Sequence, residues 1–403
     1  MLIDYGYCAA FAQYPCSLLF VNNCRSFGFG TYFTKSKRML RLTNLALVII
    51  LGSAGLQAQE TKTENLFIIT LDGLRWQELF GGMVDSMVAN PELTKYSQEV
   101  QAAFGGEKEE IRRAKLMPFF WNTIGKEGQL YGNRWKDNKV NLTNFFWFSY
   151  PGYNEILSGY SDPRINSNEK VPNPNETVLE WLNQQEEFRG RVAAFGSWDV
   201  FPYIINEERS GIPVNAGYRK AEAEDLSQRE LFLNELTDQA PVLWNSVRTD
   251  QLTHNYMMEY VKREHPKVVY ISYGETDDFA HDGSYNRYLY SAHATDGMIG
   301  DLWSYLQQDP VYAGKTTLLI TTDHGRGDSP MVEWKSHGKI YKGSNAIWFA
   351  VIGPDTPALG EMSTSGQWWQ NQVAKTGAAF LGLDYENDYE EVGKVVEEML
   401  SQD

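Results

Sequence analysis

The residues of this sequence best suited to chemistry are acids and histidines that follow short apolar runs. Residues 316–321 are β-branched and apolar, which predicts a buried strand, and Asp323, His324 and Gly325 come directly after it. Ligands gather at the carboxyl ends of strands in open parallel sheets, so this pair on a glycine turn is expected to face a site. His337 follows within reach. For the pair taken alone, the alternative is a turn with a hydrogen-bonded histidine.

Two further segments have the same pattern of an apolar run that leads to an acid. Residues 65–71 are followed by Asp72, and residues 268–273 are followed by Asp277 and His281. Asp277 and His281 are four residues apart and share one face of a helix or turn, a spacing that suits two ligands of one metal ion. The combined set holds three carboxylates and three imidazoles: Asp72, Asp277, His281, Asp323, His324 and His337.

A ligand set of this size predicts two metal ions. Sets rich in imidazole favour Zn²⁺, whereas all-oxygen sets favour Ca²⁺ or Mg²⁺. Two Zn²⁺ ions about 4 Å apart could hold the attacking and the leaving oxygen of an in-line displacement at phosphorus. The remaining histidines lie in helical or surface patterns and are interpreted as structural: His254, His265 and His293.

Residues 145–159, FFWFSYPGYNEILSG, offer a nucleophile for such a site. Ser149 follows an aromatic run and precedes a Pro-Gly turn and a helix. A helix start there would place backbone N–H groups and the positive end of the helix dipole beside the serine alkoxide and an incoming phosphate. Contact with Zn²⁺ would lower the pKa of the hydroxyl further. The alternative is Ser149 as a plain helix N-cap.

In this order along the chain, the motifs resemble the alkaline phosphatase superfamily, and most closely its type I phosphodiesterase/nucleotide pyrophosphatase branch. The resemblance extends from about Asn65 to Ile352. It implies a phosphoseryl intermediate on Ser149, where the branch often has threonine. It also implies two ligand groups, one of Asp277, His281 and His337 and the other of Asp72, Asp323, His324 and Ser149.

The same branch has an asparagine that binds a phosphate oxygen about twenty residues after the nucleophile. Asn166 and Asn168 both fit that position, and Asn154 is a third candidate. Arg326 and Lys335 lie close in sequence to candidate ligands and could add positive charge, although solvated surface is the first interpretation of both.

Strands and helices alternate around these motifs. Further strands are expected over residues 191–196 and 346–352, with helices over 177–185 and 285–308. This alternation predicts an α/β fold with a mostly parallel central sheet and helices on both faces. Residues 83–116 and 200–260 are rich in charge and helix formers. They are expected to be helical insertions that cover the edge of the sheet where the candidate site residues lie. Residues 59–403 are expected to form a single catalytic domain.

The amino-terminal residues predict export. Residues 39–58 have a basic start, an apolar run and small residues before Ala58, as in a signal peptide, and residues 1–38 are interpreted as a leader from a start codon placed too early. A retained amino-terminal anchor is the alternative. The three cysteines all lie in that leader, so the rest of the chain has neither a thiol nucleophile nor a thiolate ligand: Cys8, Cys16 and Cys24.

Charge indicates the kind of partner. Residues 59–403 hold 31 basic and 51 acidic residues, which argues against nucleic acid or an anionic membrane. The expected protein is a periplasmic or secreted two-zinc hydrolase of small anionic phosphate esters, with diesters slightly ahead of monoesters.

Three alternatives remain open. A sulfatase would need arginine at Tyr153 in its C/S-x-P-x-R motif, and a phosphoglycerate mutase would act in the cytoplasm, against the export signal. A non-catalytic binding protein on the same fold would be expected to have lost at least one ligand, yet every position holds a competent residue.

Overall fold

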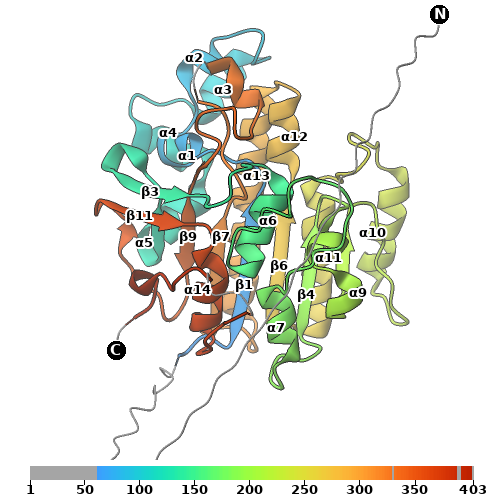
Figure 1. The fold of residues 1–403 in the computed structure, drawn as a ribbon. Coiled ribbons are helices and arrows are strands. Elements are labelled where there is room, and N and C mark those ends of the chain that lie inside the picture. Colours follow the sequence, from blue (N-terminus) through green and yellow to red (C-terminus); the bar gives the residue numbers. More distant parts are fainter. Residues whose placement is uncertain (1–60, 329–330, 388–391, 402–403) are drawn as a thin grey trace, which may run out of the picture. The chain divides into compact units, whose positions relative to one another are not determined.

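The computed structural model describes residues 61–328, 331–387 and 392–401 (Figure 1). The expected leader, the signal peptide and the three cysteines lie outside these residues. Among the described helices, none combines the length and the apolar character needed to cross a membrane.

An eight-stranded sheet forms the centre of the described chain (Figure 1). Its strands are β1 (Asn65–Leu71), β2 (Gln129–Tyr131), β4 (Val192–Gly196), β5 (Val214–Ala216), β6 (Val268–Tyr273), β7 (Thr316–Thr321), β9 (Phe349–Ile352) and β10 (Gly360–Glu361). They are arranged in the order β10-β2-β9-β7-β1-β6-β4-β5. β9 runs antiparallel to β7 and β2, and the other pairs are parallel, so the predicted mostly parallel sheet is confirmed.

The central strand is apolar on both faces, which explains why helices cover both sides of the sheet. On β1, Phe67 and Ile69 pack on one face and Leu66 and Ile68 on the other, as the two-residue period of a strand requires. All four are fully buried. The first face is covered by helices that include α11 (Asp250–Glu264) and α13 (Tyr285–Gln308), and the second by α6 (Ser149–Ser158), α7 (Val178–Gln184) and α14 (Gln372–Phe380).

A second, three-stranded sheet was not expected. It consists of β11 (Gly366–Trp369), β3 (Asn138–Asn141) and β8 (Ala346–Ile347), in that order. The apolar run at 346–352, expected to be one strand, divides at the buried Trp348, whose Nε1 donates to the Leu74 carbonyl oxygen at 2.8 Å. The residues before it join the small sheet as β8, and those after it join the main sheet as β9.

The two expected insertions differ from each other. Residues 83–116 form the helices α2 (Asp85–Val88), α3 (Ser97–Phe104) and α4 (Glu109–Leu116). Residues 200–260 form α8 (Phe201–Ile204), α9 (Glu207–Ser210) and α10 (Gln228–Gln239), but they also supply β5 and most of α11. This stretch is therefore partly a layer of the main fold, and a three-residue strand such as β5 is too short for its period to be recognised.

The remaining short helices connect these layers: α1 (Trp76–Gly81), η1 (Phe120–Ile124), α5 (Gly125–Glu127), η2 (Arg134–Lys136), α12 (Glu275–His281), η3 (Met331–Lys335) and η4 (Glu397–Met399).

Candidate active site

Three neighbouring strands bring acidic side chains to one edge of the main sheet. Asp72 follows β1, Asp323 follows β7, and Asp277 lies on α12, which begins soon after β6. Because β1 lies between β6 and β7 and all three are parallel, their carboxyl ends meet at the same edge.

Asp72, Asp323 and His324 form the first group of candidate ligands. The Nε2 atom of His324 lies 3.4 Å from Asp72 Oδ1 and 3.4 Å from Asp323 Oδ2. The other ring nitrogen, Nδ1, donates to the Gly325 carbonyl oxygen at 2.9 Å. Nε2 is therefore the unprotonated nitrogen of the neutral ring, as in metal sites where a carbonyl group fixes the tautomer of a histidine ligand.

The electrostatics of this group suit a cation. Burial, followed by the charge of neighbouring carboxylates, raises the pKa of Asp72 and of Asp323 well above the ordinary value, and burial lowers the pKa of His324 to about 4. Asp72 Oδ1 and Asp323 Oδ2 are buried without a hydrogen-bond partner among the described residues. Two unpaired carboxylate oxygens that face a neutral imidazole form a set of atoms that can hold a metal ion.

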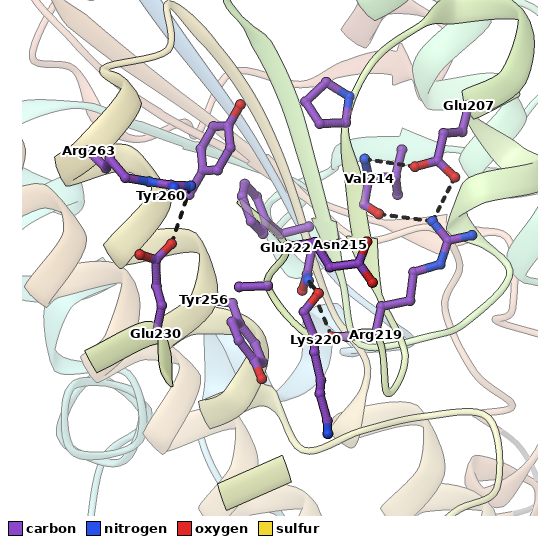
Figure 2. A pocket seen from close by; sticks show the side chains of 13 residues that line it. Glu207, Val214, Asn215, Arg219, Lys220, Glu222, Glu230, Tyr256, Tyr260 and Arg263 are labelled. Carbon is purple, nitrogen blue, oxygen red and sulfur yellow. Dashed lines mark hydrogen bonds and ion pairs between the residues drawn. The ribbon is translucent and has the colours of Figure 1, made fainter. Parts of the chain in front are cut away.

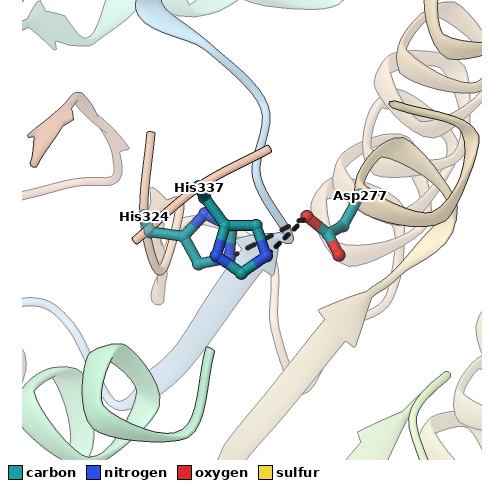
Figure 3. Close-up of side chains that lie close together, drawn as sticks. All are labelled: Asp277, His324 and His337. Carbon is teal, nitrogen blue, oxygen red and sulfur yellow. Dashed lines mark ion pairs between the residues drawn. The ribbon is translucent and has the colours of Figure 1, made fainter. Parts of the chain in front are cut away.

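A second group lies directly beside the first. His281 Nε2 is 3.0 Å from His337 Nε2 and 3.1 Å from Asp277 Oδ2. His337 Nε2 is 3.7 Å from Asp277 Oδ1. Figure 3 shows Asp277 opposite the rings of His324 and His337, which stack at 3.9 Å, and these three can also reach a single ion. The structure thus brings together all six predicted acids and histidines, with His324 within reach of both groups.

Arg326 is not the solvated surface residue that was expected. It is 1% exposed, and its guanidinium contacts the Asp277 carboxylate while donating to the Trp334 and Lys335 carbonyl oxygens at 2.6 and 2.7 Å. Burial would raise the pKa of Asp277, but Arg326, followed by His337, lowers it well below the ordinary value. Lys335 itself is half-buried.

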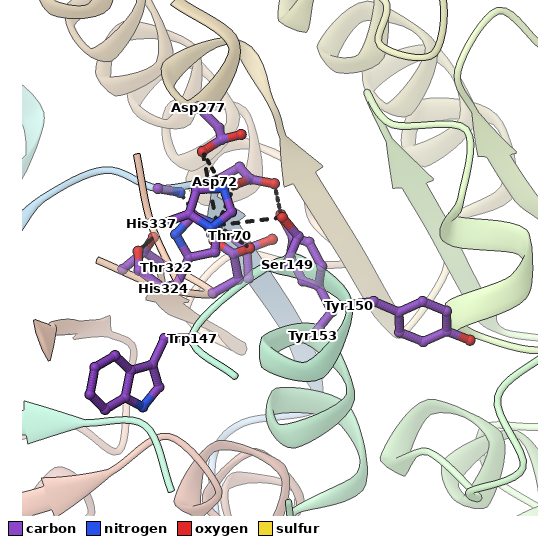
Figure 4. A network of polar contacts seen from close by, with 12 residues as sticks. Thr70, Asp72, Trp147, Ser149, Tyr150, Tyr153, Asp277, Thr322, His324 and His337 are labelled. Atoms are coloured by element: carbon purple, nitrogen blue, oxygen red, sulfur yellow. Dashed lines mark hydrogen bonds and ion pairs between the residues drawn. The ribbon is translucent and has the colours of Figure 1, made fainter. Parts of the chain in front are cut away.

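Ser149 is the first residue of α6 and faces the first ligand group (Figure 4). Its Oγ lies 3.4 Å from His324 Nε2. The helix offers fewer backbone donors than the sequence suggested, because Tyr150 N–H donates to Asn168 Oδ1 at 3.0 Å, Pro151 has no N–H, and Gly152 N–H donates to a carbonyl in its own turn. In this turn, only the Ser149 N–H has no hydrogen-bond partner, from backbone or side chain, among the described residues.

Two residues of α6 hold this helix against the ligands. A Cβ on Gly152 would lie 2.3 Å from the Asp323 carbonyl oxygen, so this contact requires glycine. One residue later, the hydroxyl of the buried Tyr153 donates to Asp72 Oδ2 at 2.7 Å and accepts from Ser272 Oγ at 3.1 Å. The sequence signalled neither role, although both residues lie within a turn of Ser149.

The structure separates the three candidate asparagines. Asn168 lines a hollow of about 160 Å³ together with Ser149 and four of the candidate ligands, which are Asp72, Asp277, His281 and His337. Asn166 is exposed and donates to the Pro163 carbonyl oxygen at 3.4 Å, and it is not part of this lining. Asn154 is fully buried and bonds to Tyr160, Asn173 and Asn175, which is a structural role.

Other lining residues of this hollow were missed by sequence reasoning. They are Trp198 and Val247, which pair as an isolated β-bridge, together with Ser246 and Asp278. Burial, and then the charge of Asp277, raises the pKa of Asp278 to about 8. No lysine or arginine lines the hollow among the described residues.

The three histidines interpreted as structural lie outside both ligand groups. His254 bonds to the Tyr273 hydroxyl at 3.0 Å, His293 to the Leu116 carbonyl oxygen at 2.8 Å, and His265 lies 3.5 Å from Asp309.

A larger hollow of about 430 Å³ lies beyond the sheet edge, beside β5 and α11 (Figure 2). It contains none of the predicted site residues. Two ion pairs, Arg219 with Glu207 and Arg263 with Glu230, lie in its lining, and no group of acids and histidines that could hold a metal ion is found there among the described residues.

Comparison with known proteins agrees with this geometry. Residues 81–342 match the family model of type I phosphodiesterase/nucleotide pyrophosphatase. The chain belongs to this family. The matched residues include Ser149, Asp277, His281, Asp323, His324 and His337. No curated protein matches the chain.

Solved structures share the fold of this phosphodiesterase-family protein at low sequence identity. The alkaline phosphatase PafA is 10% identical with a TM-score of 0.55, over 85% of this chain and 99% of that one. The lipoteichoic acid synthase LtaP from Listeria monocytogenes is 11% identical with a TM-score of 0.52, over 84% and 76%. The phosphonate monoester hydrolase of Silicibacter pomeroyi is 12% identical with a TM-score of 0.50, over 84% and 77%. The alkaline phosphatase-like α/β fold is thereby confirmed.

The family makes this protein a hydrolase of phosphate esters. Its two adjacent groups of acids and histidines, with a serine at the start of a helix lining the same hollow, are suited to displacement at phosphorus assisted by two metal ions.

Proposed function

We propose that this enzyme is an exported phosphodiesterase that works with two Zn²⁺ ions through a phosphoseryl intermediate on Ser149. The proposal rests on one observation above all. Ser149 Oγ, at the start of α6, lies 3.4 Å from the nitrogen of His324 that is within reach of both ligand groups. A hydroxyl in that position is close to any ion that either group holds.

The residues that would hold the ions follow from the two groups. Asp72, Asp323 and His324 would hold one ion together with Ser149, and Asp277, His281 and His337 the other. Three imidazoles in a six-residue set favour Zn²⁺ over Mg²⁺ or Ca²⁺. When bound, the ions would supply positive charge that lowers the pKa of the serine hydroxyl and offsets the charge of the phosphoryl oxygens.

The reaction then follows from the protein side chains. Ser149 Oγ gives its proton to water and forms a bond to phosphorus as the bond from phosphorus to the leaving oxygen breaks, and that oxygen takes a proton from water to become the alcohol. A water molecule later cleaves the phosphoseryl bond, which restores the Ser149 hydroxyl and releases the phosphate product. Asn168 holds the first turn of α6 through Oδ1, and its Nδ2 makes no hydrogen bond within the described residues. This amide would therefore donate to a phosphate oxygen.

Charge supports diesters over monoesters. A diester carries one negative charge at neutral pH and a monoester close to two. The hollow beside Ser149 is lined by Asp278, without lysine or arginine among the described residues, and Arg326 is occupied by Asp277 and two carbonyl groups. The side chains around the substrate therefore add nothing to offset the second charge of a monoester.

Side-by-side assays of bis-(p-nitrophenyl) phosphate and p-nitrophenyl phosphate test this proposal. Purified enzyme should contain about two zinc ions per chain and hydrolyse the diester with the higher kcat/KM. Ser149→Ala should lose nearly all turnover, whereas the matched control Ser158→Ala, at the other end of the same helix, should keep it. Unchanged turnover in Ser149→Ala would exclude this nucleophile, and protein without metal would favour a binding role.

The proposed export of the enzyme is tested separately, because it rests on residues 39–58 alone. Mass spectrometry of protein from the cell envelope or medium should find a mature chain that begins near Gln59. A full-length chain that stays in the cytoplasm would refute export and leave the chemistry untouched.

A further inference from the structure

We propose that the protein has a second binding site, for an uncharged saccharide, in a hollow behind the segment that leads to Ser149. The hollow has a volume of about 540 Å³, within the range of about 300–1,000 Å³ that is usual for small-molecule sites. It shares no lining residue with the hollow at the candidate ligands. Its described lining consists of Leu142, Thr143, Asn144, Phe145, Trp147, Asn345, Trp369 and Asn371.

The small sheet builds this hollow. Trp369 ends β11, which pairs with Asn141 at the end of β3, and Asn141 pairs with Ala346 at the start of β8. Leu142, Asn345 and Trp369 are therefore neighbours at one end of three paired strands, a rigid support for a binding site. Gln370, which follows Trp369, donates to the Thr322 and Asp323 carbonyl oxygens at 3.0 and 2.7 Å, so the hollow is also tied to the candidate ligand segment.

Three aromatic side chains form its walls, Phe145, Trp147 and Trp369, and Trp147 also packs partly against the core. Phe145 is 80% exposed and Trp369 is 41% exposed. Trp147 has a φ of 56°, a conformation that is strained for a bulky residue. The side chain of Asn144 holds this conformation by accepting from the Phe146 and Trp147 N–H groups at 3.0 Å each. Figure 4 shows the Trp147 ring pointing away from the candidate ligands, so the strained conformation directs this ring to the hollow and the core beside it and not to the ligand groups.

The polar groups of the hollow match hydroxyl groups. The side-chain amides of Asn345 and Asn371 make no hydrogen bond within the described residues. An amide both donates and accepts, as a sugar hydroxyl does. No described lining residue is charged, although 22% of the chain is charged. A pyranose fits this lining, because its flat C–H faces can stack on the aromatic rings and its uncharged hydroxyl groups can hydrogen-bond to the asparagine amides.

Isothermal titration of the full-length enzyme tests this site. The probes are hexasaccharides of β-1,4-linked glucose, β-1,4-linked mannose, β-1,4-linked xylose and α-1,4-linked glucose, with adenosine as an aromatic ligand that has no pyranose ring. At least one saccharide should bind. The variant with Phe145→Ala and Trp369→Ala together should bind it at least about tenfold more weakly, because both stacking surfaces are lost.

The control is Phe232→Ala, which removes an exposed aromatic side chain of α10 and should leave the affinity unchanged. The double variant should hydrolyse bis-(p-nitrophenyl) phosphate as the wild type does, so this site and the proposed reaction can fail independently. The inference is overturned if no saccharide binds, if the double variant binds as tightly as the wild type, or if adenosine alone binds.

Discussion

Removing one hydroxyl group from α6 tests whether the helix positions a metal ligand as well as the nucleophile. The Tyr153 hydroxyl donates to Asp72 Oδ2 at 2.7 Å and is fully buried. A hydrogen bond to a charged acceptor contributes about 1.5–3 kcal/mol. If that energy holds Asp72 in its binding geometry, Tyr153→Phe should lower zinc affinity and kcat/KM by about 10- to 100-fold, which is the usual effect of losing a partner of a metal ligand.

The matched control is Tyr312→Phe, because Tyr312 is also fully buried and donates to a backbone carbonyl, that of Pro266, at 2.9 Å. Each variant loses one hydroxyl group, and the free energy of unfolding should fall by about 1 kcal/mol in Tyr312→Phe and by about 1.5–3 kcal/mol in Tyr153→Phe. Zinc affinity from competition with a chelator and kcat/KM for bis-(p-nitrophenyl) phosphate then separate them. If both variants bind zinc and turn over substrate equally well, Tyr153 does not position Asp72.

Three further outcomes follow from the same structure. Gly152→Ala should lower kcat by at least tenfold, because its Cβ would lie 2.3 Å from the Asp323 carbonyl oxygen and push Ser149 away; wild-type kcat would contradict this contact. Burial lowers the pKa of His254 to about 4, against about 6.5 in the unfolded chain, so the unfolded state gains the proton first and stability falls by up to about 3 kcal/mol as pH drops from 6.5 to 4. In His254→Gln, the free energy of unfolding measured with urea should depend less steeply on pH over this range. An unchanged dependence on pH would assign the loss of stability to other groups. A chelator should lower the melting temperature by several degrees and Zn²⁺ should restore it, because Asp72 and Asp323 lose their counter-charge; an unchanged melting temperature would argue against bound metal.

The sequence predicted the candidate ligands correctly where a local apolar pattern ends at a residue type that can bind metal. The apolar runs of β1, β6 and β7 each lead to an acid, and parallel pairing of such strands brings their carboxyl ends together, so the candidate ligands could be named in advance. The four-residue spacing of Asp277 and His281 survives as the turn of α12.

The features that sequence reasoning missed or predicted wrongly depend on contacts between residues that are distant in the sequence. Arg326 looked like surface, but the turn after β7 buries its guanidinium against Asp277. The lining formed by Trp198 and Val247 exists only because two loops pair. The division of residues 346–352 at Trp348 follows from a bond to Leu74, and no local pattern could reveal that partner.

The order of the strands has a consequence for how the protein is made. β1 is paired along its length with β6 and β7, with Leu66 opposite Val268 and Asn65 opposite Thr316. A ribosome completes this strand long before either neighbour exists, so a mostly apolar segment stays unpaired while most of the polypeptide is still being synthesised. Contacts between such distant segments form slowly, and exposed apolar chain aggregates. The strand order that brings the ligands to one edge therefore leaves the newly synthesised chain in need of protection from aggregation until β7 has been made. A chaperone, or export before folding, would give that protection.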